Sequence, residues 1–370
     1  MNRGFSLWLD VLRVWATFVV VLSHFAYERF TRGDYQIIRD LNIGSDAVIL
    51  FFVVSGFVIA YASGRDGDAG IYAFNRLTRL WSVMIPAILL TFVFDRIGFS
   101  IDRSAYPDRF FQPLGLGEML LRGLSFSNEW GAFERVRLGT NGPLWSLSYE
   151  AAYYLAFAIA VFMRGPRRWT LLLVVAALVG PRVLLLMPAW LMGVWLWQHL
   201  SARNHRLSMP VSRAACFALA GPLLYVAALW AGLPGMLRVF TADLMAPLPY
   251  RAVLVFSDEF IWNALIGIFA TQHLLGMARL LEAKQKDIPL IRWLAGASFS
   301  VYVTHYPALH LLDALVPADA PGHDIILLTG AIAVGLIFAQ VFERRIGAIR
   351  VLIAGFLPNR SPHKRPIAAE

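Results

Sequence analysis

Residues 5–27 form the first apolar stretch of the sequence, and three ionisable side chains interrupt it: Asp10, Arg13 and His24. On an α-helix, 11 residues turn about 20° beyond three full turns, so Arg13 and His24 share one face, roughly 16 Å apart along the axis. Asp10 lies on the same stripe. A neutral imidazole can act as a general base toward a hydroxyl, and we expect that chemistry at His24. The alternative is an ion pair that only orients the helix.

A carboxylate lies in the apolar stretch that begins near residue 143. Pro143 is well placed to start a helix, and Glu150 then lies about two turns inside it. This helix runs opposite to the first, so we expect Glu150 at a depth close to that of His24. An unpaired carboxylate there is costly, so Glu150 must have a partner, be protonated or face water.

Arg76 and Arg79 are three residues apart at the start of another apolar stretch. Their spacing points both side chains in the same direction on a helix. Paired guanidinium groups can bind a phosphate through parallel hydrogen bonds. The alternative is that these arginines only anchor the cytoplasmic end of a membrane span.

Two further polar patterns occur within apolar stretches. Ser55 and Gly56 are small, so another helix or a ligand can approach that face closely. Ser298, Tyr302 and His305 form one polar stripe of a later helix, at positions i, i+4 and i+7. A network of hydrogen bonds between helices would also explain that stripe.

The segments that carry these residues are apolar enough to span a membrane. Of the 370 residues, 58% are hydrophobic and 15% charged, below the roughly 25% charged residues of soluble domains. We expect an all-α, polytopic membrane protein of about ten transmembrane helices, with both termini in the cytoplasm. The expected spans are 5–27, 47–63, 78–97, 143–163, 169–183, 184–200, 213–231, 252–277, 294–315 and 324–342. The pair within 169–200 is short and broken by prolines, which also fits a re-entrant arrangement.

Loop charges support this topology. The net charge is +9, and most basic residues fall in the segments placed on the cytoplasmic side, as the positive-inside rule requires. We therefore attribute the charge to the membrane, with no nucleic acid as partner. We expect a membrane domain, 1–342, followed by a basic cytoplasmic tail, 343–370, that is disordered toward its end. The outer loop 98–142 is long, and its 114–126 stretch is expected to form an interfacial helix.

Together and in this order, these patterns resemble the acyltransferase 3 family of membrane acyltransferases. The matching pieces are Arg13-x10-His24, FFVVSGFVI at 51–59, Arg76-x2-Arg79 with Pro86, PLWSLSYE at 143–150 and SFSVYVTHYP at 298–307. The chain departs from many relatives at Ala151, where they have a second acidic residue, and near His305, where they often have Trp.

The resemblance implies transfer of an acyl group, most often acetyl, from cytoplasmic acyl-CoA to a hydroxyl of an extracytoplasmic carbohydrate or lipid-linked glycan. The expected location is a bacterial cytoplasmic membrane. Acyl-CoA would be a co-substrate, and we expect no bound cofactor and no metal. The expected catalytic residues are His24, Arg13, Asp10 and Glu150. The expected donor-binding residues are Arg76, Arg79, Ser55 and Gly56. The expected acceptor or structural residues are Trp145, Ser148, Tyr302 and His305.

Two other classes of protein fit part of the pattern. A proton-coupled secondary transporter would use the charges of Asp10, Arg13, His24 and Glu150, although the sequence shows no inverted repeat. A non-catalytic membrane scaffold would leave these intramembrane charges unexplained. Transfer of label from acetyl-CoA to polysaccharide would separate the acyltransferase from both.

Overall fold

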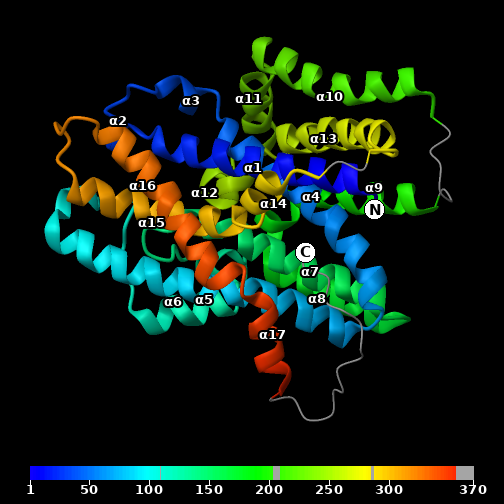
Figure 1. The fold of residues 1–370 in the computed structure, drawn as a ribbon, viewed down its shortest axis with the longest axis horizontal. Coiled ribbons are helices and arrows are strands. Elements are labelled where there is room, and N and C mark those ends of the chain that lie inside the picture. Colours follow the sequence, from blue (N-terminus) through cyan, green and yellow to red (C-terminus); the bar gives the residue numbers. More distant parts are fainter. Residues whose placement is uncertain (109, 203–208, 285–286, 356–370) are drawn as a thin grey trace.

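The computed structural model describes residues 1–108, 110–202, 209–284 and 287–355, and these residues form helices and connecting loops with no β-strand (Figure 1). The end of the tail, 356–370, lies outside the described residues. The expected all-α fold is therefore confirmed for the part of the chain described.

The helices follow one another through short connections, apart from the loop after α5. The α-helices are α1 (Arg3–Phe25), α2 (Glu28–Thr31), α3 (Gln36–Asp40), α4 (Ile43–Asp66), α5 (Ala69–Ile101), α6 (Leu116–Leu124), α7 (Trp145–Phe162), α8 (Pro166–Leu184), α9 (Met187–Ala202), α10 (Val211–Trp230), α11 (Leu233–Met245), α12 (Tyr250–Leu254), α13 (Phe260–Leu280), α14 (Pro289–Ala295), α15 (Ser298–Leu315), α16 (His323–Phe338) and α17 (Ile346–Gly355). Shorter 3₁₀ or π segments are η1 (Arg103–Ala105), η2 (Ser127–Glu129), η3 (Gly142–Leu144), η4 (Val255–Ser257) and η5 (Ala339–Glu343).

Seven helical stretches within the described residues are long and apolar enough to cross a membrane. They are Arg3–Phe25, Ile43–Asp66, Ala69–Ile101, Gly142–Phe162, Val211–Trp230, Tyr250–Leu280 and His323–Leu352. The pair α8 and α9 qualifies only jointly and is bent by 104°, which would make it an eighth span. The broken arrangement expected for 169–200 is thus present. The expected total of ten spans is reached only if α8, α9 and α15 are each counted as a span in addition to these seven.

Helix α15 is absent from that set because it carries polar side chains such as His305, His310 and Asp313. Its residues from Ser300 to His310 are all buried. A helix enclosed by other helices needs no lipid-facing apolar surface, since protein rather than lipid surrounds it. Polar chemistry can therefore be held on α15 at membrane depth.

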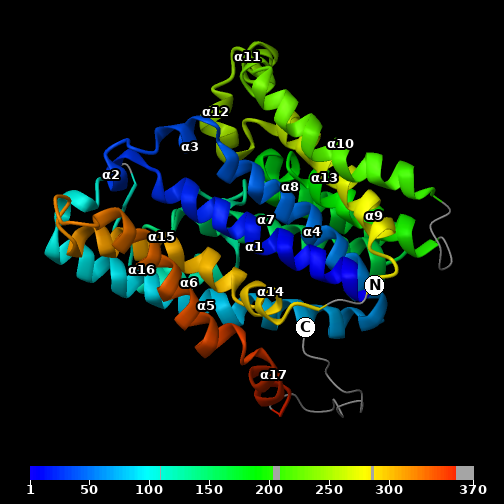
Figure 2. The ribbon, with the colours of Figure 1, turned by 45° about the horizontal axis from the view of Figure 1, so that its top comes forward.

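Helix α1 lies beside both α4 and α15, with its first residues near the N-terminal label and its last residues beside α2 (Figure 2). Its start is fixed by Asn2, whose side chain accepts a hydrogen bond of 2.7 Å from the Phe5 amide. Helices α10 and α11 stand at one edge of the molecule and α17 projects at the opposite edge. The long inner helices α1, α4, α5, α7 and α15 thus surround the polar residues of interest.

Gly56, which was predicted for the donor site, lies at a helix crossing. A Cβ atom at Gly56 would overlap the carbonyl oxygen of Trp190 on α9. Reciprocally, a Cβ at Gly193 would overlap the carbonyl of Val53 on α4. The absence of side chains lets the two backbones touch, which is the usual function of small residues in packed membrane helices.

The loop after α5 and the tail carry short helices of their own. A helix is present within the stretch 114–126, as α6, and its position at a membrane interface stays a prediction. In the tail, α17 is ordered against α5: Arg350 donates 3.1 Å hydrogen bonds to the Thr78 hydroxyl and the Asn75 carbonyl. The first part of the expected tail is therefore helical and docked.

Candidate active site

Two histidines from helices far apart in the sequence meet directly. The Nδ1 atom of His24, at the end of α1, lies 2.9 Å from the Nε2 atom of His305 on α15. The Nδ1 atom of His305 lies 3.1 Å from the carbonyl oxygen of Val301, one turn earlier on its own helix. His305 is fully buried, whereas His24 keeps partial exposure. His24 is therefore the member of the pair that a substrate can reach.

The hydrogen bonds fix the tautomers of a neutral pair. A carbonyl oxygen only accepts, so Nδ1 of His305 must carry the hydrogen, and its Nε2 must be an acceptor. The hydrogen between the rings then belongs to Nδ1 of His24. This leaves the Nε2 atom of His24 unprotonated, with a lone pair available to accept a proton.

Two tyrosines flank the His24 ring. The ring of Tyr27 is stacked at 5.9 Å between centroids, and the ring of Tyr306 lies at 4.9 Å. Neither was predicted as a site residue. The available signal was their closeness in sequence to the histidines: Tyr27 follows His24 by three residues, and Tyr306 directly follows His305.

A cavity of about 120 Å³ is lined in part by Tyr302, whose ring neighbours that of His305, and neither histidine of the pair lines it. It is lined by predicted site residues from α1, α4, α5, α7 and α15, together with Tyr154 and Ser298: Arg13, Ser55, Arg76, Arg79, Glu150, Tyr154, Ser298 and Tyr302. Three arginines and one carboxylate give its walls an excess of positive charge, which suits an anionic ligand.

Arg76 is nearly fully buried and only loosely paired in this cavity wall. Its nearest carboxylate oxygen, on Asp66, lies 3.7 Å from NH2. Its Nε has no hydrogen-bond partner within the described residues. A buried donor without a partner is costly, and a bound phosphate oxygen would satisfy it.

Glu150 lies in the cavity wall and not beside the histidines. Its Oε1 accepts hydrogen bonds from the Ser55 hydroxyl and, at 2.7 Å, from the Tyr154 hydroxyl. Trp190 adds a 3.3 Å hydrogen bond to Ser55. No hydrogen bond joins Glu150 to His24 in the described part of the chain. The equal depth inferred from sequence therefore does not bring the carboxylate to the imidazole.

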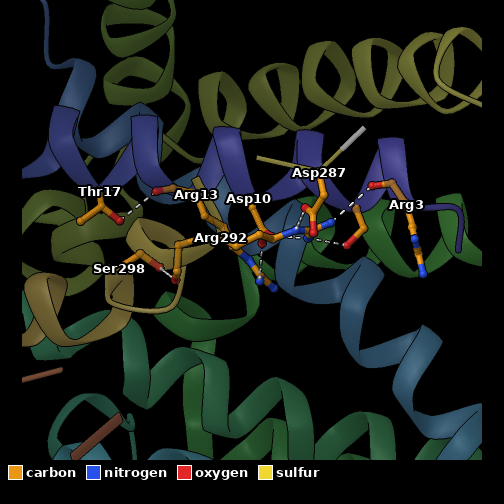
Figure 3. A network of polar contacts seen from close by, with 9 residues as sticks. Arg3, Asp10, Arg13, Thr17, Asp287, Arg292 and Ser298 are labelled. Atoms are coloured by element: carbon orange, nitrogen blue, oxygen red, sulfur yellow. Dashed lines mark hydrogen bonds and ion pairs between the residues drawn. The ribbon is translucent and has the colours of Figure 1, made fainter. Parts of the chain in front are cut away.

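Asp10 and Arg13 belong to a polar network along the first half of α1 (Figure 3), whereas His24 lies at the last turn of that helix. Asp10 Oδ1 lies 3.4 Å from Arg13 NH1, and its other oxygen pairs with Arg292 of α14. Arg292 also binds Asp287 at 2.8 Å, and this hydrogen bond lowers the pKa of the exposed Asp287 carboxyl. Asp10 therefore positions Arg13, which lines the cavity, and makes no contact with His24.

The polar stripe of α15 connects the cavity with the histidine pair. Ser298 and Tyr302 line the cavity, and the Tyr302 ring lies 6.0 Å from the ring of His305. The Tyr302 hydroxyl is held by Ser146 at 2.7 Å and by the Pro143 carbonyl at 3.0 Å. Helix α1 makes the same connection, because Arg13 lines the cavity and His24 belongs to the histidine pair.

Trp145 and Ser148, the remaining predicted residues, contact other parts of the protein. The Trp145 ring stacks on Phe256 at 4.4 Å. The Ser148 hydroxyl binds the Phe126 carbonyl in the outer loop. Across the described residues, no three His, Cys, Asp or Glu side chains are grouped so as to hold a metal ion.

Comparison with known proteins agrees with these features. A sequence model of an acyltransferase domain, that of the acyltransferase 3 family, matches residues 6–344. The chain belongs to the acyltransferase 3 family. It is also similar to "Acyltransferase MdmB" of Streptomyces mycarofaciens, with 33% identity over 156 residues. That match spans 41% of this chain and 38% of the relative. No solved structure matches the chain significantly.

The match to the acyltransferase 3 family includes every predicted site residue, from Asp10 to His305. Together with the long apolar helices, membership in this family identifies the chain as a multi-pass membrane protein.

Proposed function

We propose that this protein transfers an acyl group, acetyl by default, from cytoplasmic acyl-CoA to a hydroxyl of an extracytoplasmic carbohydrate or glycosylated acceptor, in a bacterial cytoplasmic membrane. Family membership supports acyl transfer over the transporter alternative. The observation that carries the proposal is the arginine-lined cavity beside Tyr302, whose ring in turn neighbours His305 of the His24–His305 pair.

The donor would enter from the cytoplasmic side. In the topology we propose, both termini are cytoplasmic, so α5 begins on that side and carries Arg76 and Arg79 in its first turns, and Arg13 of α1 lines the same cavity further along its helix. These guanidinium groups would bind the phosphates of acyl-CoA. The narrow pantetheine arm would extend into the cavity, where Glu150 can accept hydrogen bonds from its amide groups. The thioester would then lie toward Tyr302 and the histidines.

The reaction at His24 follows from the inferred tautomers. Nε2 of His24 removes the proton of the acceptor hydroxyl while that oxygen attacks the thioester carbonyl carbon. The tetrahedral intermediate collapses with cleavage of the carbon–sulfur bond. The departing thiolate takes the proton from Nε2, so His24 returns to its starting state and the products are the ester and free CoA.

Sealed inside-out membrane vesicles test the proposal, because their lumen holds the extracytoplasmic face. Radiolabelled acetyl-CoA added outside should produce alkali-labile label on luminal glycans. Vesicles that carry His24→Ala serve as the control. Label that appears only after the vesicles are opened would exclude reaction across the membrane. No label in either state would reject acyl transfer to these glycans.

Replacement of Arg76 or Arg79 with alanine should raise the KM for acyl-CoA by about tenfold or more, because hydrogen bonds to charged groups contribute roughly 1.5–3 kcal/mol. The KM for the acceptor should change less. Lysine should rescue poorly, since it cannot form the bidentate contact. Steady-state kinetics in detergent would measure both constants.

Arg167→Ala provides a matched control for these variants, because Arg167 is an exposed arginine in the first turn of another helix, α8, and does not line the cavity. An unchanged KM for acyl-CoA in both Arg76 and Arg79 variants would show that these arginines only anchor the topology.

A further inference from the structure

Three arginines interleave with aromatic rings beside the partly exposed His24. We call Arg29, Arg39, Arg137, Tyr27, Phe110 and Tyr306 the arginine–aromatic cluster. The cluster combines α2, α3, the outer loop and α15, so segments far apart in sequence build it. None of its residues lines the cavity that contains Arg13, Arg76 and Arg79.

The cations of the cluster lie against ring faces. The Cζ atom of Arg29 lies 4.6 Å from the Tyr27 centroid and 4.0 Å from that of Phe110. The Cζ of Arg39 also lies 4.0 Å from the Tyr27 centroid. Arg29 also donates to the Tyr306 hydroxyl. Stacking of this kind fixes a guanidinium group while leaving N–H groups at its edge available.

Arg39 and Arg137 have neutral hydrogen-bond partners. NH1 of Arg39 donates to the hydroxyl and carbonyl of Ser23, at 2.8 and 3.1 Å. NH1 of Arg137 donates to the Phe110 carbonyl at 3.0 Å. Neither forms an ion pair with a described residue, in contrast to Arg135, which binds Glu129 at 2.9 Å. Each guanidinium has five N–H donors, so most donors of Arg39 and Arg137 have no acceptor among the described residues.

The cluster also adjoins the ring of His24, the proton acceptor of the proposed reaction. Tyr27 and Tyr306 are both ring neighbours of His24. Aromatic faces suit the apolar faces of sugar rings, whereas unpaired guanidinium donors suit carboxylate and phosphate oxygens. A ligand that uses both would therefore have its hydroxyl groups near His24.

We infer that the arginine–aromatic cluster binds an acceptor that carries a negative charge, either a phosphate or a carboxylate on or next to the sugar. This inference rests on the proposed function, because it assigns the acceptor side of that site. A lipid-linked sugar phosphate and an acidic sugar would both supply the required anion.

Equilibrium binding of three radiolabelled probes tests the inference: phenyl glucoside, phenyl glucuronide and phenyl glucoside 6-phosphate. In phosphatidylcholine nanodiscs, the wild-type protein should bind the charged probes about tenfold or more tighter than the neutral one, as expected for charge-assisted hydrogen bonds. Arg39→Gln and Arg137→Gln should remove most of this preference. Arg103→Gln is the matched control, because Arg103 is an exposed outer-loop arginine beside the ring of Phe99. A preference for phosphate over carboxylate would favour the lipid-linked source.

Equal binding of neutral and charged probes by the wild type would overturn the inference. So would a preference that survives in both variants, or variants that change only the response to added phosphatidylglycerol, since the arginines would then bind lipid headgroups. Salt should weaken binding of the charged probes alone in the wild type, a readout that needs no variant. Because binding is measured without acyl transfer, retained discrimination with no acetyl-CoA turnover would support this site while rejecting the proposed function.

Discussion

Replacement of His24 with alanine should abolish acyl transfer, with kcat lowered by about 10²–10⁴-fold, the range that a positioned acid–base group contributes. The physical reason is that Nε2 of His24 is the inferred proton acceptor, and alanine offers none. Acyl-CoA affinity should persist, since the cavity that would hold the donor is built from other residues. Single-turnover transfer from radiolabelled acetyl-CoA, alongside direct binding of acetyl-CoA, would measure the two effects separately.

His199→Ala is a matched control for this variant. His199 is also a partly exposed helical histidine packed on an aromatic ring, that of Trp195 at 5.0 Å, but it lies outside the proposed site. Near-normal transfer by the His24→Ala protein would remove His24 from the mechanism. Loss of acetyl-CoA binding in the same variant would instead indicate that the cavity had collapsed.

The helices and the polar stripes could be predicted from the sequence because both depend on local periodicity. A continuous α1 keeps Arg13 and His24 on one face at different depths, and that face meets the cavity at one residue and His305 at the other. The stripe of Ser298, Tyr302 and His305 on α15 has the same property. Regular helical spacing is sufficient for such statements.

The partners of these stripes could not be predicted, because they depend on how helices pack. Arg292 binds Asp10 across 282 residues of sequence, and no local pattern indicates this contact. Glu150 was expected at the depth of His24 from its position along its own helix, but it lines the cavity with Arg13, because such an estimate gives no direction across the bundle. Its real neighbours are Ser55 and Tyr154, and only the second, four residues away, was visible as a same-face pair.

The number of spans was uncertain for a related reason. A hydropathy argument assumes that each span is one continuous helix with a surface that faces lipid. Helix α15 is surrounded by protein along its polar stretch, and the α8–α9 pair turns by 104°. Both depart from that assumption. The sequence did signal the second case through Pro181 and Pro188, which fall near the bend.

Replacement of His305 with alanine or leucine should lower kcat strongly, by about 10²-fold, the lower end of the range for acid–base groups, while KM for both substrates changes little. His305 touches no substrate in the proposed reaction; it acts as a positioning residue. Its Nε2 accepts the hydrogen of His24 Nδ1, and that contact holds the proton away from Nε2 of His24. Without it, His24 can adopt the other tautomer or rotate, and the lone pair is lost from the reacting position.

A glutamine at position 305 separates this role from simple packing. Its side-chain oxygen can accept from Nδ1 of His24 while its amide group donates to the Val301 carbonyl, which reproduces the two contacts of the native ring. His305→Gln should therefore retain more kcat than His305→Leu, although leucine fills the buried space about as well. The order of the two variants decides the question, provided that both accumulate to wild-type levels in the membrane. Equal loss in both would mean that His305 only fills space, and His24 would then need another group to fix its tautomer. Leucine more active than glutamine would contradict the hydrogen-bonded pair altogether, because an apolar side chain cannot orient an imidazole.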